Sequence, residues 1–261
     1  MKDINDELID KTVEVYGENL ENLTIPTSKS IGNNIGLMVD GIFGWIGIWG
    51  QKQKIKQEKY IKEFKENLNK KLENIPEDKI IEPKVNIIGP TLETAKYYFE
   101  EEYYKEMFTN LICASCNSEK SSNIHPSFIE TIKQLSPLDA KLLNMFQYNA
   151  TYPVAEIESR NRDKTITPFP HVLCDFKNKN QEFNEEEAIH LSTSIENLVR
   201  LGIIIKNRAV IELKYDYNLF KSHFLYKIFE KGREEDSKIE IIRYRIELTN
   251  YGRNFFNICI K

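Results

Sequence analysis

The sequence has 261 residues, enough for one large domain or two modest ones, and 41% of them are hydrophobic. A chain of this length and composition can bury a core without disulfides or metal, which excludes a disordered, fibrous or disulfide-rich class. The net charge of -4, from 36 basic and 40 acidic residues, excludes a generally basic nucleic-acid-binding protein but is compatible with a local basic face.

The cysteines and the N-terminal charge indicate the compartment. Four cysteines, unevenly placed, do not resemble the disulfide framework of a small secreted protein. Residues 1–23 hold seven acidic side chains against two lysines, which is the opposite of the basic start of a signal peptide. We therefore expect a cytoplasmic protein.

The least ordinary part of the chain is the apolar stretch IGNNIGLMVDGIFGWIGIWG at residues 31–50, which contains six of the 11 glycines. Wound as a helix, it places large apolar side chains on one side and glycines with Asp40 on the other. Each glycine lowers helix stability by about 1 kcal/mol relative to alanine, so close packing or a membrane must supply what propensity does not. The residues expected to make a membrane or oligomer contact are Gly36, Met38, Asp40, Ile42, Gly44, Trp45, Gly47 and Trp49.

Three structures compete for this stretch. A buried helix, or two short ones, would use the glycines to let a neighbouring backbone approach. A membrane helix fits because 20 residues can span the hydrocarbon core, small residues suit helix contacts in lipid, and lysines follow directly. Asp40 opposes the membrane helix, because a carboxylate is costly in hydrocarbon. A phosphate-binding loop lacks its GxxxxGK[ST] pattern, whereas the first two structures stay open.

Helical patterns follow in the next hundred residues. They lie, in chain order, at 51–73, 91–116, 126–135 and 136–148. Lysines line the outside of the first, and prolines open the second and third. The fourth begins at the capping signature Ser136-Pro137-Leu138-Asp139. The patterns predict a helical N-terminal domain over residues 1–135.

The helical pattern ends near Ala150. Residues 151–183 are predicted to be a loop, since they hold Pro153, Pro168 and Pro170. Capping-box spacings, Asn184 with Glu187 and Thr193 with Glu196, then predict two short helices joined by a turn. These helices lie at 185–191 and 194–201, and Gly202 ends the second.

Strand patterns complete the C-terminal half. They lie at 203–206, 210–214 and 239–248, and Thr249 caps a last helix. Two helices in a turn followed by strands are typical of a winged helix-turn-helix domain, predicted here over residues 136–261. The expected fold is therefore mainly α, with a helical N-terminal domain followed by an α+β winged helix-turn-helix domain.

That motif brings candidate nucleic-acid contacts with it. Its second helix would expose Asn197 and Arg200, and Lys206 and Arg208 lie at the adjacent turn. Phosphate neutralisation supplies most of the affinity for DNA, and this basic stripe is sparse. A structural or protein-docking role is therefore favoured over DNA binding.

Cysteine and histidine offer one metal-like pattern. Cys113-Ala-Ser-Cys116 and His171-Val-Leu-Cys174 together hold three thiols and an imidazole, a ligand set for tetrahedral zinc. The first pair lies near the C-terminal end of its predicted helix, without the turn and glycine of a zinc knuckle. Small hydrophobic side chains in a core explain each cysteine equally well. We expect no metal and no cofactor.

No sequence motif predicts an enzyme. Glu100, Glu101 and Glu102 occupy successive helix positions and point to different sides, which is typical of a solvated face. His125 precedes a helix start, and no histidine stands beside an obvious nucleophile and acid in the sequence. The serine elbow, the kinase motifs and HExxH are absent. We therefore expect no catalytic residue.

Several stretches together resemble the abortive-infection alpha (Abi-alpha) family of bacterial proteins. The resemblance is strongest over residues 72–146, above all in HPSFIETIKQLSPLDAKLL (His125–Leu143). The later SIENLVRLGII (Ser194–Ile204) and IELTNYGRNFFNIC (Ile246–Cys259) look like the C-terminal half of the family. Membership implies a role in bacterial defence against phage, and it implies no catalytic residue.

The resemblance and the patterns lead to two functional hypotheses. The first is a phage-defence protein that acts as a sensor or effector through protein or membrane contact, with peripheral attachment at the inner membrane. Its partner would be an unknown protein or phage trigger, other copies of itself, or lipid. The alternative is a winged-helix DNA-binding regulator or silencer.

Overall fold

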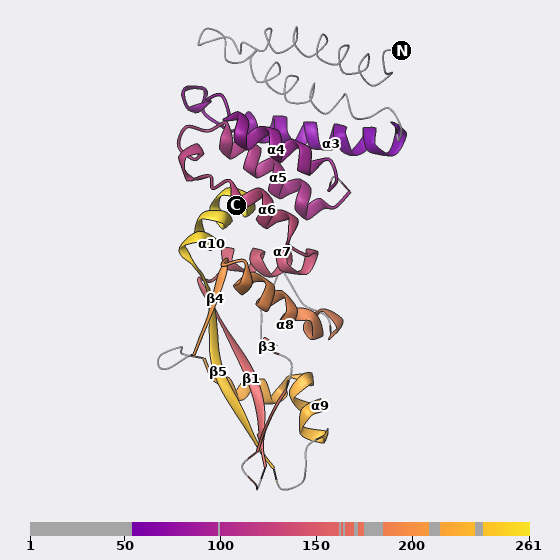
Figure 1. The fold of residues 1–261 in the computed structure, drawn as a ribbon, viewed down its shortest axis with the longest axis vertical. Helices are drawn as coiled ribbons and strands as arrows, with labels where there is room; N and C mark the ends of the chain where they lie inside the picture. Colours follow the sequence, from indigo (N-terminus) through magenta and orange to yellow (C-terminus); the bar gives the residue numbers. More distant parts are fainter. Residues whose placement is uncertain are drawn as a thin grey trace, which may run out of the picture. The chain divides into compact units, whose positions relative to one another are not determined.

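The computed structural model describes residues 54–98, 100–161, 163, 165–169, 172–174, 185–208, 215–232 and 237–261 (Figure 1). The chain divides into two compact units, Met1–Ser122 and Asn123–Lys261. The apolar stretch 31–50 and the predicted strand 210–214 lie outside the described residues.

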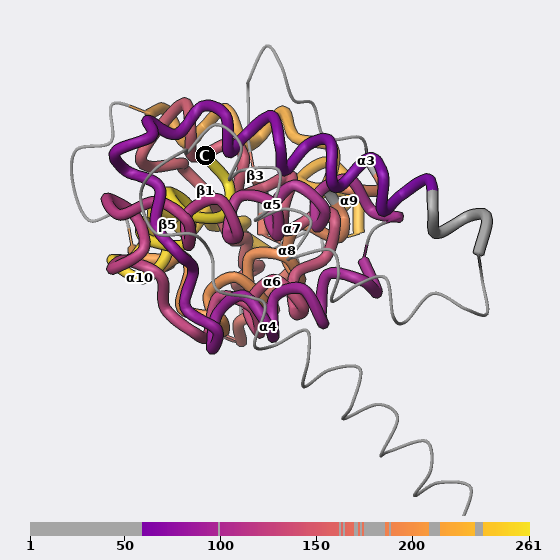
Figure 2. The backbone as a smooth tube through the Cα atoms, turned by 90° about the horizontal axis from the view of Figure 1, so that it is seen from above, coloured from indigo at the N-terminus to yellow at the C-terminus, as the bar shows by residue number. Residues whose placement is uncertain are grey.

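The described part of the first unit is helical. It contains α3 (Lys54–Leu72), α4 (Val85–Ala95) and α5 (Glu102–Ser115), with a short 3-10 turn at Glu77–Lys79. Helix α5 packs against both α3 and α4, and Figures 1 and 2 show it beside each of them. Every residue of α5 from Met107 to Ser115 is buried, as expected for a helix that is apolar on most of its circumference.

The predicted helix over 91–116 is two helices in the structure. Helix α4 begins before Pro90, which lies inside it on the exposed side, and it ends at Ala95. Backbone turns then connect it to Glu102, where α5 begins. A proline on the outer side of a helix is tolerated because the carbonyl that it leaves unpaired can face water.

The second unit combines helices with an antiparallel sheet. Its helices are α6 (Ser127–Lys133), α7 (Pro137–Asn144), α8 (Glu185–Arg200), α9 (Phe224–Gly232) and α10 (Asn250–Phe255). Its strands are β1 (Thr151–Arg160), β2 (Ile166–Pro168), β3 (Leu173–Cys174), β4 (Ile204–Arg208) and β5 (Lys238–Leu248). The order is β2-β1-β5-β4, and β3 also pairs with β1.

The prediction of a mainly α chain that ends in a winged helix-turn-helix is wrong. The described residues form a mixed α/β structure in which β1 and β5 pair antiparallel over ten residues, from Thr151–Glu247 to Arg160–Lys238. The predicted strand at 203–206 was expected to form a wing with the strand at 210–214. In the described residues, β4 pairs with β5. The sheet, and not a wing on a helical core, organises this unit.

Strand β1 lies where a loop was expected. Pro153 suggested a loop, but at this point β1 pairs only with β5, because β3 joins its other edge from Val154 onward. A proline is compatible with a strand where its missing N–H would face an open edge. Buried Tyr152 and Val154 on either side of half-buried Pro153 then follow the period of a strand.

Helix α8 replaces the predicted pair of short helices. Thr193, expected to cap the second helix, lies exposed in the middle of one continuous helix. Leu191, Ile195 and Leu198 form a single buried stripe along it. Gly202 has a φ of 70°, and the N–H of Ile203 donates to the carbonyl of Leu198 at 2.9 Å, so the helix ends in a Schellman motif at the predicted glycine.

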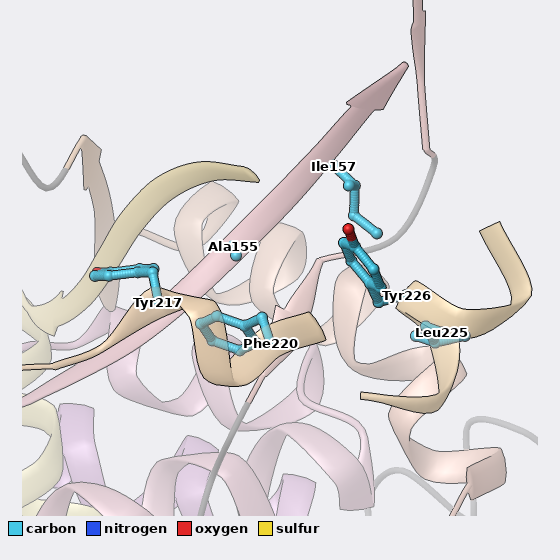
Figure 3. Close-up of a cluster of buried hydrophobic side chains, with 6 residues drawn as sticks. All are labelled: Ala155, Ile157, Tyr217, Phe220, Leu225 and Tyr226. Atoms are coloured by element: carbon cyan, nitrogen blue, oxygen red, sulfur yellow. The ribbon is translucent and has the colours of Figure 1, made fainter. Parts of the chain in front are cut away.

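The sheet has a separate core on each face. On one face, side chains from β1 pack against the 3-10 helix Tyr217–Ser222 and α9 (Figure 3). This cluster comprises Ala155, Ile157, Tyr217, Phe220, Leu225 and Tyr226. On the other face, toward the opposite end of the strands, Tyr152, Ile204 and Ile246 are buried. The strands therefore contribute side chains to two cores, one on each face of the sheet.

The close approach of α10 to β4 gives a test of this arrangement. A Cβ on Gly252 would lie 1.8 Å from the carbonyl oxygen of Ile203, which already accepts the N–H of Thr249. We expect Gly252→Ala to lower the free energy of unfolding by about 3 kcal/mol in urea titrations, because backbone must move to admit the methyl group. Gly232→Ala is the control: in the part of the chain that the structure describes, no atom beyond its own helix and chain neighbours lies within 4 Å of an added Cβ, and we expect a change below about 1 kcal/mol. Equal stability of the two variants would contradict the described packing.

Candidate functional site

The predicted contact segment itself lies outside the described residues. This applies to all eight of its candidate residues: Gly36, Met38, Asp40, Ile42, Gly44, Trp45, Gly47 and Trp49. The described chain begins shortly after them with α3, so α3 is the part of the fold through which this segment is attached. Among the described residues, no helix has the length and apolarity needed to cross a membrane.

Helix α3 has one apolar and one basic side. Phe64, Leu68 and Leu72 are fully buried, and the helix packs on α5. On the far side, the side chains of Lys59 and Lys62 are 76% and 79% exposed. The helix carries seven lysines against three glutamates, so its outer surface is basic.

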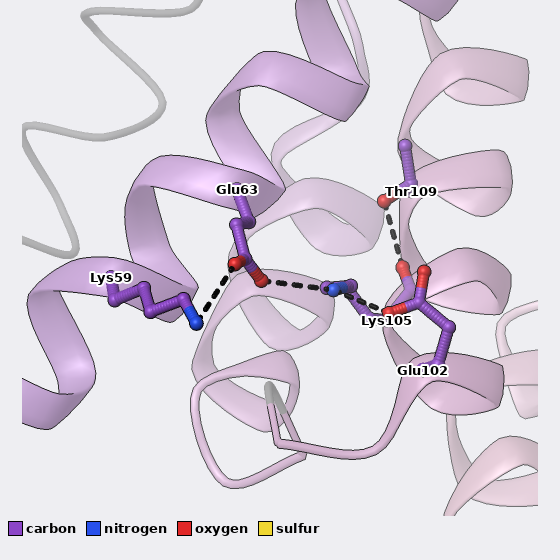
Figure 4. A network of polar contacts seen from close by, with 5 residues as sticks. All are labelled: Lys59, Glu63, Glu102, Lys105 and Thr109. Carbon is purple, nitrogen blue, oxygen red and sulfur yellow. Dashed lines mark hydrogen bonds and ion pairs between the residues drawn. The ribbon is translucent and has the colours of Figure 1, made fainter.

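A buried lysine joins α3 to α5 (Figure 4). The amine of Lys105 lies 3.4 Å from a carboxylate oxygen of Glu63 on α3 and 2.5 Å from one of Glu102 on α5. Its side chain is only 7% exposed. Burial lowers the pKa of Lys105, but hydrogen bonds to Glu102 and Glu63 and their charges raise it by more, so the pKa lies above its usual value. The pairing therefore stabilises the fold fully below the ordinary lysine pKa and is lost only as the pH rises through the folded value.

A second polar contact lies farther along the same two helices. The amine of Lys71 donates to Oδ1 of Asn110 at 2.5 Å and lies 3.2 Å from Glu106. Glu63 and Lys71 lie about two turns apart on α3, so the helix is held at two points along α5, which opposes rotation about its axis. We call these contacts together the α3–α5 polar seam. The rotation that they set turns Lys59 and Lys62 outward.

Sequence reasoning missed this seam. Glu102 belongs to the carboxylate run that was interpreted as a solvated face, although it pairs with Lys105. The signal was available in part, because Lys105 stands one turn from Glu102 and on the same stripe as Phe108 and Ile112. Glu63 could not be identified in this way, since its contact with Lys105 is made only through tertiary packing.

Two of the predicted nucleic-acid contacts belong to an internal network. The side-chain amide of Asn197 donates to the carbonyl of Gln134 and to Oδ2 of Asp139, both at 2.9 Å. Its oxygen accepts two hydrogen bonds from Arg200, at 3.2 and 2.7 Å. Asp139 is buried and also accepts the N–H of Ser136 in a capping box. The amide group of Asn197 thus attaches α8 to the start of α7 and to Gln134 just before it, while its oxygen pairs with Arg200 of the same helix.

The other two predicted contacts lie on strand β4. Lys206 and Arg208 are two residues apart, so both side chains lie on the same face of the sheet. Their pairing partners on β5 are Ile246 and Tyr244. The amine of Lys206 pairs with Glu156 and lies 4.9 Å from the centre of the Tyr244 ring, whereas Arg208 is exposed. The four residues therefore lie on two different elements, Asn197 and Arg200 on α8 and the other two on β4.

The cysteines occupy core positions. Cys113 on α5 and Cys116, the residue directly after this helix, are buried, and burial raises the pKa of each thiol to about 12. Cys174 is buried on β3, where burial also raises its pKa, and His171 lies outside the described residues. Within the part of the chain that the structure describes, no three His, Cys, Asp or Glu side chains are placed to hold a metal ion.

One serine lies close to a histidine. The hydroxyl of Ser127 is 2.6 Å from Nδ1 of His125 and 2.9 Å from the hydroxyl of Tyr251, which lies 2.6 Å from that of Thr131. The backbone N–H of Ser127 also donates to Nδ1, so this nitrogen is an acceptor and the serine hydroxyl donates to it. Among the described residues, no carboxylate hydrogen-bonds to His125, and the cluster connects α6 to α10.

Comparisons with known proteins identify one family. A family profile described as abortive infection alpha matches residues 56–259. No protein of curated function matches the chain. Among solved structures, the chain is similar to an uncharacterized protein from the hydrocarbon-degrading marine bacterium Alcanivorax borkumensis SK2, with 12% identity and a TM-score of 0.37, over 55% of this chain and 96% of that one. A TM-score this low does not establish a shared fold.

The network around Asn197 gives a stability prediction. We expect Asn197→Ala to lower the free energy of unfolding by about 2–3 kcal/mol, because it removes hydrogen bonds and leaves the buried Asp139 with one partner fewer. Thr193→Ala, at an exposed position of the same helix, should change it by less than about 0.5 kcal/mol. Urea unfolding measures both, and a loss in Asn197→Ala no larger than that of the control would disprove this role.

The polar seam can be tested by double-mutant cycles. We expect Lys105→Met and Glu63→Gln to show a coupling energy of about 1–2 kcal/mol, because the lysine is buried. The matched pair is Lys62 and Glu66, which lie 4.0 Å apart on the surface of α3 and should couple by less than about 0.5 kcal/mol. Similar coupling in the two cycles would mean that the seam does not position α3.

Proposed function

The chain belongs to the abortive infection alpha family, and from this premise we propose that it defends bacteria against phage as a non-catalytic sensor or effector that acts through protein or membrane contact. In this proposal it is a cytoplasmic protein that attaches peripherally to the inner membrane. The stretch 31–50 is its contact element, and α3 connects that element to the first unit.

The observation that carries the proposal is the outward basic side of α3 directly after an apolar, tryptophan-containing stretch. The apolar side of α3 is already buried, whereas its lysines Lys59, Lys62 and Lys70 are exposed to solvent. An apolar element next to a basic one supplies the two signals that stable peripheral attachment to a membrane requires. Trp45 and Trp49 are suited to the membrane interface.

The glycines suggest how the stretch would act. Once its large apolar side meets lipid or other copies, the glycine side would line a seam between helices, because small residues allow close approach in lipid. Asp40 lies on that side and would be shielded from hydrocarbon there. In the resting protein the apolar side must be covered.

The chemistry of the described residues supports a role without catalysis. Thiols with a pKa near 12 stay protonated at neutral pH and are poor nucleophiles. Ser127 and His125 belong to a cluster that holds two helices together. Their proximity is accounted for by this structural role.

Variants of the glycine-rich stretch test the proposal in infected cells. We expect the wild type to protect cells and to depolarise them during infection. The double variant Gly44→Leu/Gly47→Leu should lose both effects, because leucine prevents close helix contact. Trp45→Asp should also lose both, because it places a charge on the apolar side. Survival and a potential-sensitive dye measure the two effects.

The control variant is Gly232→Ala, whose added methyl group meets no atom within 4 Å. It should protect cells like the wild type. If the two test variants fold, accumulate normally and protect cells fully, the stretch belongs to a core and the proposal is wrong.

A further inference from the structure

The outer surface of α3 carries a line of exposed lysines. We define the lysine face as Lys59, Lys62 and Lys70, all of which are exposed. Within the described ranges, the first two form i,i+4 pairs, at 3.8 Å from Glu63 and 4.0 Å from Glu66. Solvent-exposed pairs at such distances contribute little and leave the amines available to a partner.

The inward lysines of the first unit have a different arrangement. Lys71 and Lys105 are directed to carboxylates across the α3–α5 polar seam, at 3.2 Å from Glu106 and 3.4 Å from Glu63. These contacts fix the rotation of α3 and, with it, the direction of the lysine face. The face is therefore a fixed surface of the first unit.

We propose that the lysine face binds the anionic phospholipid headgroups of a membrane surface. This inference rests on the proposed function, because it names the lipid class against which the stretch 31–50 would be placed. The three lysines extend along about 16 Å of helix, a straight row that suits a flat surface. Each lysine near an anionic bilayer strengthens binding about fivefold.

The composition of the helix favours lipid over nucleic acid. Helix α3 contains no arginine, so it lacks the planar fork that binds a phosphate through two hydrogen bonds. Lysine ammonium groups act as point charges and are attracted to a diffuse negative surface. The stretch 31–50 also precedes the face directly, and its tryptophans suit the depth of the headgroups.

Vesicle binding by the full chain tests this inference. The probes are vesicles of phosphatidylcholine alone and vesicles with about 30% phosphatidylglycerol, titrated as salt rises from about 50 to 500 mM. We expect binding only to the anionic vesicles, with affinity falling as salt rises. The triple variant Lys59→Gln/Lys62→Gln/Lys70→Gln should bind about 100-fold more weakly, and Lys→Glu substitutions at the same positions should abolish binding.

The control triple is Lys221→Gln/Lys227→Gln/Lys231→Gln, which removes the same charge from exposed positions of the second unit. It should bind within about threefold of the wild type, since these lysines are not on the lysine face. Equal loss in both triples would show a nonspecific effect of net charge and would overturn the inference. It would also be overturned by wild-type affinity in the test triple, or by lysine-dependent binding to duplex DNA without binding to anionic vesicles.

Trp45→Asp separates this inference from the proposed function. This variant keeps the lysine face, so we expect it to bind anionic vesicles at low salt and to lose this binding as salt rises. Loss of depolarisation with retained low-salt vesicle binding would support both proposals. Full depolarisation by the folded lysine-face triple would overturn the inference and leave the proposed function intact.

Discussion

The pairing of β1 with β5 is the constraint on which the second unit depends. Ten antiparallel pairs place β5 in the middle of the sheet, and β4, β2 and β3 are added to the edges of this pair. The same pairing orients the side chains that pack on either face. The turn at Gly202 then brings Ile203 against Thr249 and Gly252, which joins the end of α8 to the start of α10.

The first unit follows a different principle. Its central helix is buried on nearly every side, and burial of apolar area is not directional. The polar seam fixes the orientation of α3 relative to α5, because Lys105 can be buried only where carboxylates from both helices reach it. Apolar packing thus holds α3 in place, and the seam determines which side of it faces water.

Local chemistry was predictable from the sequence, and long-range pairing was not. Ser136 and Thr249 cap their helices, Gly202 ends α8, and β5 spans the predicted strand, because each of these features depends on residues close in the chain. Strand β1 was not predictable, since its partner is remote in sequence and Pro153 resembles a loop signal. Likewise, Asn197 and Glu63 have their roles only through tertiary partners. Glu187 likewise pairs with Lys141 at 2.7 Å, a contact with a residue remote in the sequence.

The position of β5 in the chain has a consequence for synthesis. A ribosome releases the residues of the first unit long before it completes Leu248, so those helices can form while the second unit still lacks its central strand. Until that strand emerges, one edge of β1 has no partner over all ten of its residues, and β2 and β3 pair with only five residues on the other edge. Nascent chains are thus exposed to aggregation through β1 for most of the time that the second unit is being translated.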